Sequence, residues 1–186
     1  YFDGAVSAAK VALVYSRYTQ DNYAGDDTHA AYLDHVRGYY CALQEAHIPF
    51  DVVSDKFIDD KLLQAYDVLV LPNCACLSDA AAAAIERFVT RGGSLVATFD
   101  TGACDLDGKK RAAPALAALC GVSVEGRRSG LKSSYARIEH ADDPLLAGIT
   151  PTLGGVVNRT VTTWNGNVAV NDTAARSDTL ATLTRA

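Results

Sequence analysis

The first two thirds of the sequence alternate short apolar runs with segments in which apolar residues recur at helical spacing. Runs rich in Val and Leu occur at Val11–Tyr15 and Asp67–Leu71. Between them, apolar residues recur every three or four positions from Thr28 to about His47. Parallel strands produce short continuous apolar runs because helices cover both of their faces. The alternation therefore predicts an α/β domain in which helices cover a parallel sheet.

The same alternation continues as far as Gly121. Further strands are predicted at 50–53 and 94–99, and further helices at 57–66, 79–91 and 112–120. Ser78 is placed to cap the second of these helices, and Gly92-Gly93 supplies the left-handed residue that ends it. The polar segment from Ser16 to Asp27 is expected to be a loop. The result is a three-layer α/β arrangement with four parallel core strands.

Beyond Gly121 the pattern changes to alternating Thr and Val with polar connections, which is typical of antiparallel or mixed strands. Strands are predicted at 135–139, 160–164, 168–170 and 180–184. Asn165-Gly166 favours a two-residue hairpin, because both residues tolerate positive φ angles. With no repeat or linker in view, we expect a single domain over residues 1–186. It would comprise a core of about 11–150 and a C-terminal β extension of about 151–186.

Composition argues against several kinds of partner. The 186 residues are 49% hydrophobic and 21% charged, with a net charge of -5. A chain of this size can bury a core without metal or disulfide. Its mild acidity and lack of a large basic cluster argue against nucleic acid. No apolar run approaches the roughly 20 residues that span a bilayer, so no membrane partner is expected.

Cofactors and metals are not expected either. Neither a Gly-x-Gly-x-x-Gly nor a Gly-rich run ending in Gly-Lys-Ser/Thr is present, so a nucleotide would lack a phosphate cradle. Cys74 and Cys76 have no second Cys or His pair at zinc-finger spacing. The five cysteines form an odd set in mainly apolar stretches, so we interpret them as free thiols of a reducing compartment and expect a cytoplasmic protein.

Ligands of an open parallel sheet gather beyond the carboxyl ends of its strands. Four loops follow the predicted strands, at residues 16–18, 54–55, 73–76 and 100–104. Within them, Arg17, Asn73 and Asp100 are the candidate binding residues. One function left open is a module that holds a small sugar at these three side chains.

The order of elements resembles the class I glutamine amidotransferase-like fold, a flavodoxin-like sheet in which the turn after the fourth strand carries a nucleophilic Cys within Gly-x-Cys-x-Gly. The corresponding turn here, residues 98–102, reads Thr-Phe-Asp-Thr-Gly. Asp100 thus takes the place of the nucleophile. Because a carboxylate cannot form the thioester of glutamine hydrolysis, no glutaminase reaction is expected.

An enzymatic alternative rests on Cys104, which lies two residues past Gly102. Glu139 and His140 would supply an adjacent acid and base. The resembled fold places these groups in a His-x-Glu order, which this sequence does not show. A stand-alone amidotransferase-like or hydrolase-like enzyme using Cys104 is therefore the second function left open.

Three further stretches resemble one family in particular, the beta-galactosidase trimerisation domain of glycoside hydrolase family 42. Tyr39–Val53 is similar to the family's Tyr-Tyr-x-Ala-Leu…Ile-Pro-x-Asp-Val-Val segment, and Tyr66–Asp79 and Phe88–Gly102 follow in the same order. The resemblance implies a non-catalytic accessory and oligomerisation domain, part of a longer glycosidase-like chain. Its partners would be further copies of itself, as in a trimer, and the catalytic barrel of the parent. The tail after about Pro151 has no counterpart in the resemblance.

Overall fold

A computed structural model describes residues 4–23, 28–129, 134–138, 152–155, 160–165, 168–172 and 176–185. Contacts within the chain group it into two compact units, Tyr1–Ala115 and Leu116–Ala186. The expected single domain, with a core of about 11–150 and an extension of about 151–186, stays a prediction.

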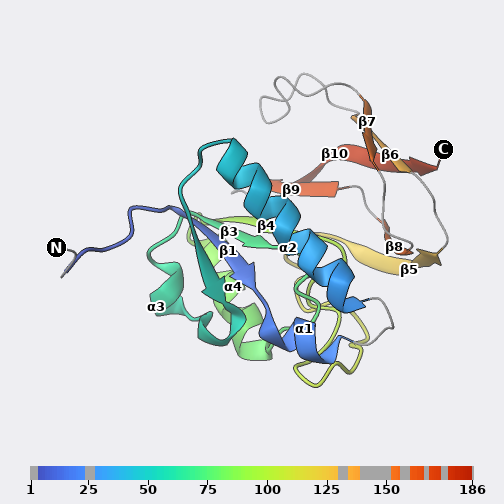
Figure 1. Cartoon of the computed structure of the whole chain (residues 1–186). Coiled ribbons are helices and arrows are strands. Elements are labelled where there is room, and N and C mark those ends of the chain that lie inside the picture. Colours follow the sequence, from blue (N-terminus) through green and yellow to red (C-terminus); the bar gives the residue numbers. More distant parts are fainter. Residues whose placement is uncertain are drawn as a thin grey trace. The chain divides into compact units, whose positions relative to one another are not determined.

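A four-stranded parallel sheet forms the centre of the first unit (Figure 1). Its strands are β1 (Val11–Tyr15), β2 (Phe50–Ser54), β3 (Val68–Leu71) and β4 (Ser94–Ala97). They lie in the order β2-β1-β3-β4, and Val11 pairs with both Phe50 and Val68. This is the strand order of a flavodoxin-like sheet. The predicted fold class is confirmed.

Helices cover both faces of this sheet (Figure 1). They are α1 (Arg17–Asn22), α2 (Thr28–Glu45), the 3₁₀ helix η1 (Asp55–Phe57), α3 (Asp60–Leu63) and α4 (Asp79–Thr90). α2 lies on one face, and α4 lies on the other. α4 buries Ala81, Ile85 and Phe88, which recur at helical spacing. The three predicted layers are therefore present.

Both predicted ends of α4 are confirmed. The Ser78 hydroxyl accepts a hydrogen bond from the Ala81 N–H at 3.0 Å, as an N-cap does. Gly92 has a φ of 101°, which favours glycine. A Cβ on Gly93 would lie 2.4 Å from the Phe88 ring, closer than two non-bonded carbon atoms can approach. Glycine at position 93 therefore lets the backbone pass over this ring after the helix ends.

Two predicted segments differ from the structure. The supposed loop from Ser16 to Asp27 contains α1, because Ser16 caps it by accepting a hydrogen bond from the Thr19 N–H at 3.0 Å. Residues 112–120 form turns instead of a helix. Pro114 lacks an N–H, and the Ala115 N–H donates to the Gly102 carbonyl at 2.9 Å, so neither contributes a helical hydrogen bond.

The second unit contains antiparallel strands, as predicted. They are β5 (Ser123–Ser129), β6 (Ser134–Ile138), β7 (Thr152–Gly155), β8 (Thr160–Asn165), β9 (Val168–Asp172) and β10 (Arg176–Arg185). One sheet has the order β7-β6-β10-β9, and β5 pairs with β8 in another. In the described strands β8 pairs with β5 and β9 pairs with β10, so the predicted pairing of β8 with β9 is not found there. Gly166, the second residue of the predicted turn, lies outside the described residues.

Among the residues that the structure describes, no helix combines the length and the apolar character needed to cross a membrane.

Candidate functional site

The loops that follow the four parallel strands meet at one edge of the first unit, where the sequence predicts ligand binding. Hydrogen bonds join them in pairs. The Ser16 hydroxyl after β1 donates to Asp55 after β2 at 2.6 Å. The Asp100 N–H after β4 donates to the side-chain oxygen of Asn73 after β3 at 3.3 Å. We call this set of bonded loops the carboxyl edge.

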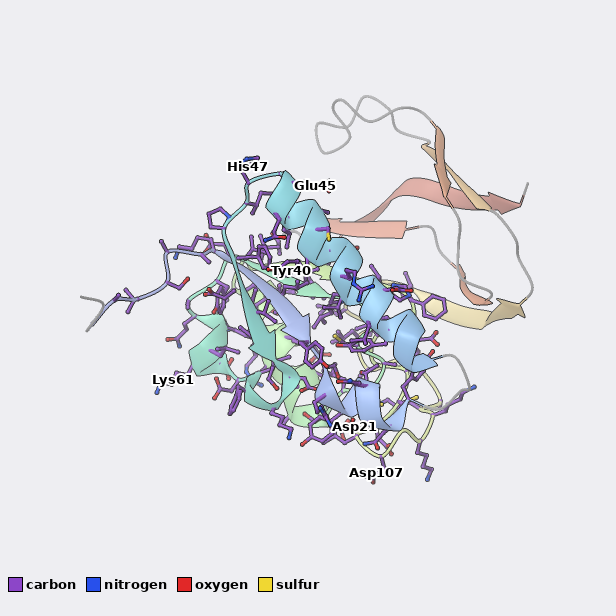
Figure 2. The ribbon with its side chains drawn as sticks, in the orientation of Figure 1. Asp21, Tyr40, Glu45, His47, Lys61 and Asp107 are labelled. Carbon is purple, nitrogen blue, oxygen red and sulfur yellow. The ribbon has the colours of Figure 1, made fainter. Side chains whose placement is uncertain are left out.

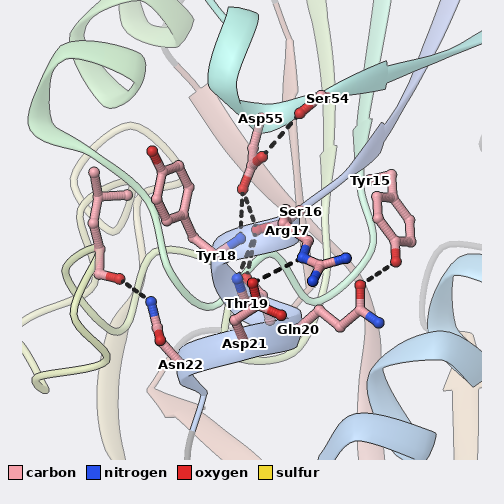
Figure 3. Close-up of polar contacts among 11 residues, drawn as sticks. Tyr15, Ser16, Arg17, Tyr18, Thr19, Gln20, Asp21, Asn22, Ser54 and Asp55 are labelled. Carbon is pink, nitrogen blue, oxygen red and sulfur yellow. Dashed lines mark hydrogen bonds and ion pairs between the residues drawn. The ribbon is translucent and has the colours of Figure 1, made fainter.

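Asp55 fastens the first two loops of the carboxyl edge (Figure 3). Its side chain is buried, with 7% of the residue exposed. One carboxylate oxygen accepts from the Ser16 hydroxyl and from the Tyr18 N–H at 3.2 Å, and the other accepts from the Ser54 hydroxyl at 3.2 Å. Both oxygens therefore accept hydrogen bonds from neighbouring residues, so this acid links the loops that follow β1 and β2.

Thr19, on α1, connects this acid to the loop after β3. Its hydroxyl lies 2.7 Å from that of Ser16 and donates to it, because the single Ser16 hydroxyl proton goes to Asp55, and its oxygen accepts from the Cys76 N–H at 3.0 Å. Thr19 and Ser16 are 1% and 0% exposed. The first turn of α1 is thus a buried polar link between β1 and the Asn73–Cys76 loop.

Asp100 occupies the position at which the resembled fold places its nucleophile, and it is buried. It is 2% exposed, and its carboxylate accepts a hydrogen bond from the Tyr23 hydroxyl. The left-handed residue at this bend is its neighbour Phe99, with a φ of 54°, and Asn73 on the adjacent loop has a φ of 49°. Such backbone strain persists only where the surroundings hold it in place.

Three cysteines are buried at the same edge. Cys76 and Cys104 are joined by a backbone bridge. Burial raises the pKa of the Cys104 thiol, and it raises the pKa of Cys76 to about 12. Burial also raises the pKa of Cys74. A nucleophilic cysteine needs the opposite shift, toward the thiolate.

Glu139 and His140, the other two members of the catalytic alternative, lie outside the described residues. Catalysis by Cys104 with Glu139 and His140 therefore stays a prediction. Within the described part of the chain, no group of three or more His, Cys, Asp or Glu side chains could hold a metal ion.

The three candidate binding residues do not share one environment. Asn73 and Asp100 are buried and bonded to each other, as described above. The Arg17 side chain is 57% exposed and forms an ion pair with Asp21 at 2.8 Å along α1 (Figure 3). Sugar binding by Arg17, Asn73 and Asp100 stays a prediction, for which Arg17 would have to turn away from Asp21.

Sequence reasoning placed the four loops but missed the residues that close them. Ser16, Thr19 and Tyr23 lie in the segment that was expected to be a loop. A signal for them exists, because Ser16 follows a strand and precedes Thr19 by three positions, the spacing of a helix N-cap and its N3 residue. The tyrosine bond to Asp100 has no such local signal, since 77 positions separate the two residues.

Comparisons with known proteins agree with one another. The family described as the beta-galactosidase trimerisation domain matches residues 9–179. The expectation that the tail after about Pro151 has no counterpart in this family is therefore wrong as far as residue 179. Beta-galactosidase BgaP of Planococcus sp. (strain L4) is 31% identical over 97 residues, which are 50% of this chain and 14% of that protein. The chain thus spans about one seventh of the length of this curated relative.

Solved structures show the same fold. The beta-galactosidase from Bacillus circulans sp. alkalophilus has a TM-score of 0.75 at 22% identity, over 95% of this chain and 25% of that one. A ThuA-like protein from Bacteroides uniformis has a TM-score of 0.61 at 14% identity, over 88% of this chain and 65% of that one. The family match covers most of the 186 residues. This chain belongs to the beta-galactosidase trimerisation domain family.

Proposed function

We propose that this chain serves as a non-catalytic accessory and oligomerisation domain of a beta-galactosidase-like glycoside hydrolase. The observation that carries the proposal is the family match over residues 9–179. The lengths of the relatives support it, since this chain aligns with only 25% of the Bacillus circulans enzyme. The catalytic barrel would then lie in the remainder of the parent chain.

The buried side chains of the carboxyl edge support a non-catalytic role for this chain. Where the resembled fold mounts a thiol, Asp100 is buried and bonded to Tyr23. The nearby thiol of Cys104 is 2% exposed, with a raised pKa. A catalytic pocket needs space beside a reactive group, and the polar side chains described here are instead bonded to one another.

The partners that we propose are further copies of the chain, assembled as a trimer, and the parent's own barrel. The family description supports the first of these. The compartment that we propose is the cytoplasm, which suits five free cysteines.

Hydrolysis assays on the purified chain test the proposal. The substrates are aryl beta-galactosides, glutamine and aryl esters, and Cys104→Ala is assayed beside the wild type. We expect no turnover of any substrate by either protein. Turnover that the substitution abolishes would establish the enzymatic alternative and overturn the proposal.

A further inference from the structure

A shallow depression of about 530 Å³ lies at the end of α2 and the start of β2. Its lining comes from the end of one helix, the connecting turn and an edge strand. The lining residues are Tyr40, Gln44, His47, Ile48, Pro49, Phe50 and Val52. We call this surface the α2–β2 depression. Figure 2 labels Tyr40 and His47 at its helical side.

The lining of the α2–β2 depression combines aromatic and aliphatic side chains with two polar ones, Gln44 and His47. None of its lining residues is Asp, Glu, Lys or Arg, although 21% of the chain is charged. Three large apolar side chains are exposed here, namely Tyr40 (40%), Ile48 (42%) and Val52 (54%). Interface cores are enriched in aromatic residues and depleted of charged ones.

The walls of the α2–β2 depression are held in place before any partner binds. The Ile48 N–H donates to the Leu43 carbonyl and the His47 N–H donates to the Gln44 carbonyl, both at 3.0 Å, the paired bonds of a Schellman motif. The Tyr40 and Phe50 rings pack edge to face with centroids 5.2 Å apart. A preorganised surface loses less entropy on association than a mobile one.

We propose that the α2–β2 depression receives a second copy of this chain during assembly. The inference rests on the proposed function, because the family's description as a trimerisation domain is what selects a copy as the occupant. In a closed trimer each subunit contact is heterologous, so the depression of one copy meets a different surface of the next. β2 adds to this contact because it is an edge strand. Among the described residues no strand pairs with its outer side, which can therefore meet a neighbouring subunit.

Sedimentation equilibrium of the 186-residue chain tests this surface with Ile48→Asp and Val52→Asp. Each substitution places a charge in the contact, so we expect the association constant to fall at least about 10-fold. The matched control is Phe57→Asp, whose side chain is 68% exposed and lies outside the depression. We expect the control to associate within about 2-fold of the wild type. Far-UV circular dichroism verifies that each variant folds.

The outcomes separate this inference from the proposed function. If the wild type associates and the two depression variants associate equally well, another surface forms the contact and this inference is wrong, while oligomerisation stands. Equal weakening by Phe57→Asp would also contradict it, because the effect would then not be specific to the depression. A wild-type chain that stays monomeric at every concentration would overturn the oligomerisation proposal itself.

Discussion

The carboxyl edge and the α2–β2 depression of the first unit are built on opposite principles. At the carboxyl edge, buried polar groups such as Asp55 and Asp100 are bonded to their neighbours. At the depression, apolar side chains such as Ile48 and Val52 remain exposed. The polar groups at the carboxyl edge, where ligands of such sheets usually bind, are thus used for internal hydrogen bonds. The exposed apolar side chains lie at the α2–β2 depression instead. We therefore propose that this sheet keeps its fold while its function lies at another face.

Among the effects expected at neutral pH, removal of the buried acid Asp55 from the carboxyl edge is the largest. Asp55→Ala leaves the Ser16 hydroxyl and the Tyr18 N–H without their acceptor. We expect the free energy of unfolding to fall by about 2 kcal/mol, the cost of buried polar groups without partners. Urea denaturation measures it. A loss within error of zero would show that water replaces the carboxylate and that the edge is open.

Alkaline pH is also expected to lower the free energy of unfolding through the carboxyl edge. The pKa of Cys76 is raised to about 12, so its thiol stays protonated in the folded chain while the unfolded thiol ionises near its ordinary pKa of 9.0. The stabilising contribution is complete below about pH 9 and is lost as the pH rises toward 12. One such thiol contributes about 1.4 kcal/mol per pH unit in this window.

Denaturation of the wild type and of Cys76→Ala between pH 8 and pH 11 measures this loss. We expect the variant to show a shallower fall in stability above pH 9, because one raised thiol is absent. Parallel curves for the two proteins would mean that Cys76 ionises in the folded state as readily as in the unfolded one.

At the α2–β2 depression, His47→Gly is expected to stabilise the chain slightly. His47 ends α2 with a φ of 57°, a left-handed conformation that favours glycine. Relief of this strain should raise the free energy of unfolding by about 0.5–1 kcal/mol. Thermal unfolding measures it, with Ile48→Ala, in the same turn but with ordinary backbone requirements, as the comparison. A destabilised glycine variant would indicate that the imidazole itself holds the turn.

The smallest expected effect is that of sugars on thermal unfolding. A ligand that binds the folded state raises the melting temperature. Since Asn73 and Asp100 are buried, we expect galactose to leave the melting temperature of the wild type and of Arg17→Ala unchanged. A rise in the wild type that Arg17→Ala removes would instead establish the carboxyl edge as a sugar site.

Much of the first unit could be predicted from its sequence. β1 has the predicted bounds and α4 has the predicted cap, because apolar periodicity and capping side chains are local signals. The convergence of the four loops also followed, since parallel strands share a carboxyl edge. Segments decided by distant contacts could not be predicted in this way. Residues 112–120 form turns partly because Ala115 bonds to Gly102, and β8 pairs with β5.

The candidate site likewise contains residues that local sequence patterns indicated and residues that they did not. Asn73 and Asp100 were identified from their loops, whereas the Tyr23 hydroxyl that bonds to Asp100 comes from a segment without apolar periodicity. The α2–β2 depression was not identified either, although its residues lie within the Tyr39–Val53 stretch that carries the family resemblance. A depression depends on which apolar side chains the fold leaves uncovered, and periodicity alone does not report that.

The mass of the purified wild-type chain in solution, measured by sedimentation equilibrium over a wide concentration range, tests the oligomerisation role most directly. The account predicts a concentration-dependent approach to three times the chain mass of 19.7 kDa. A single species of 19.7 kDa at every concentration would contradict it.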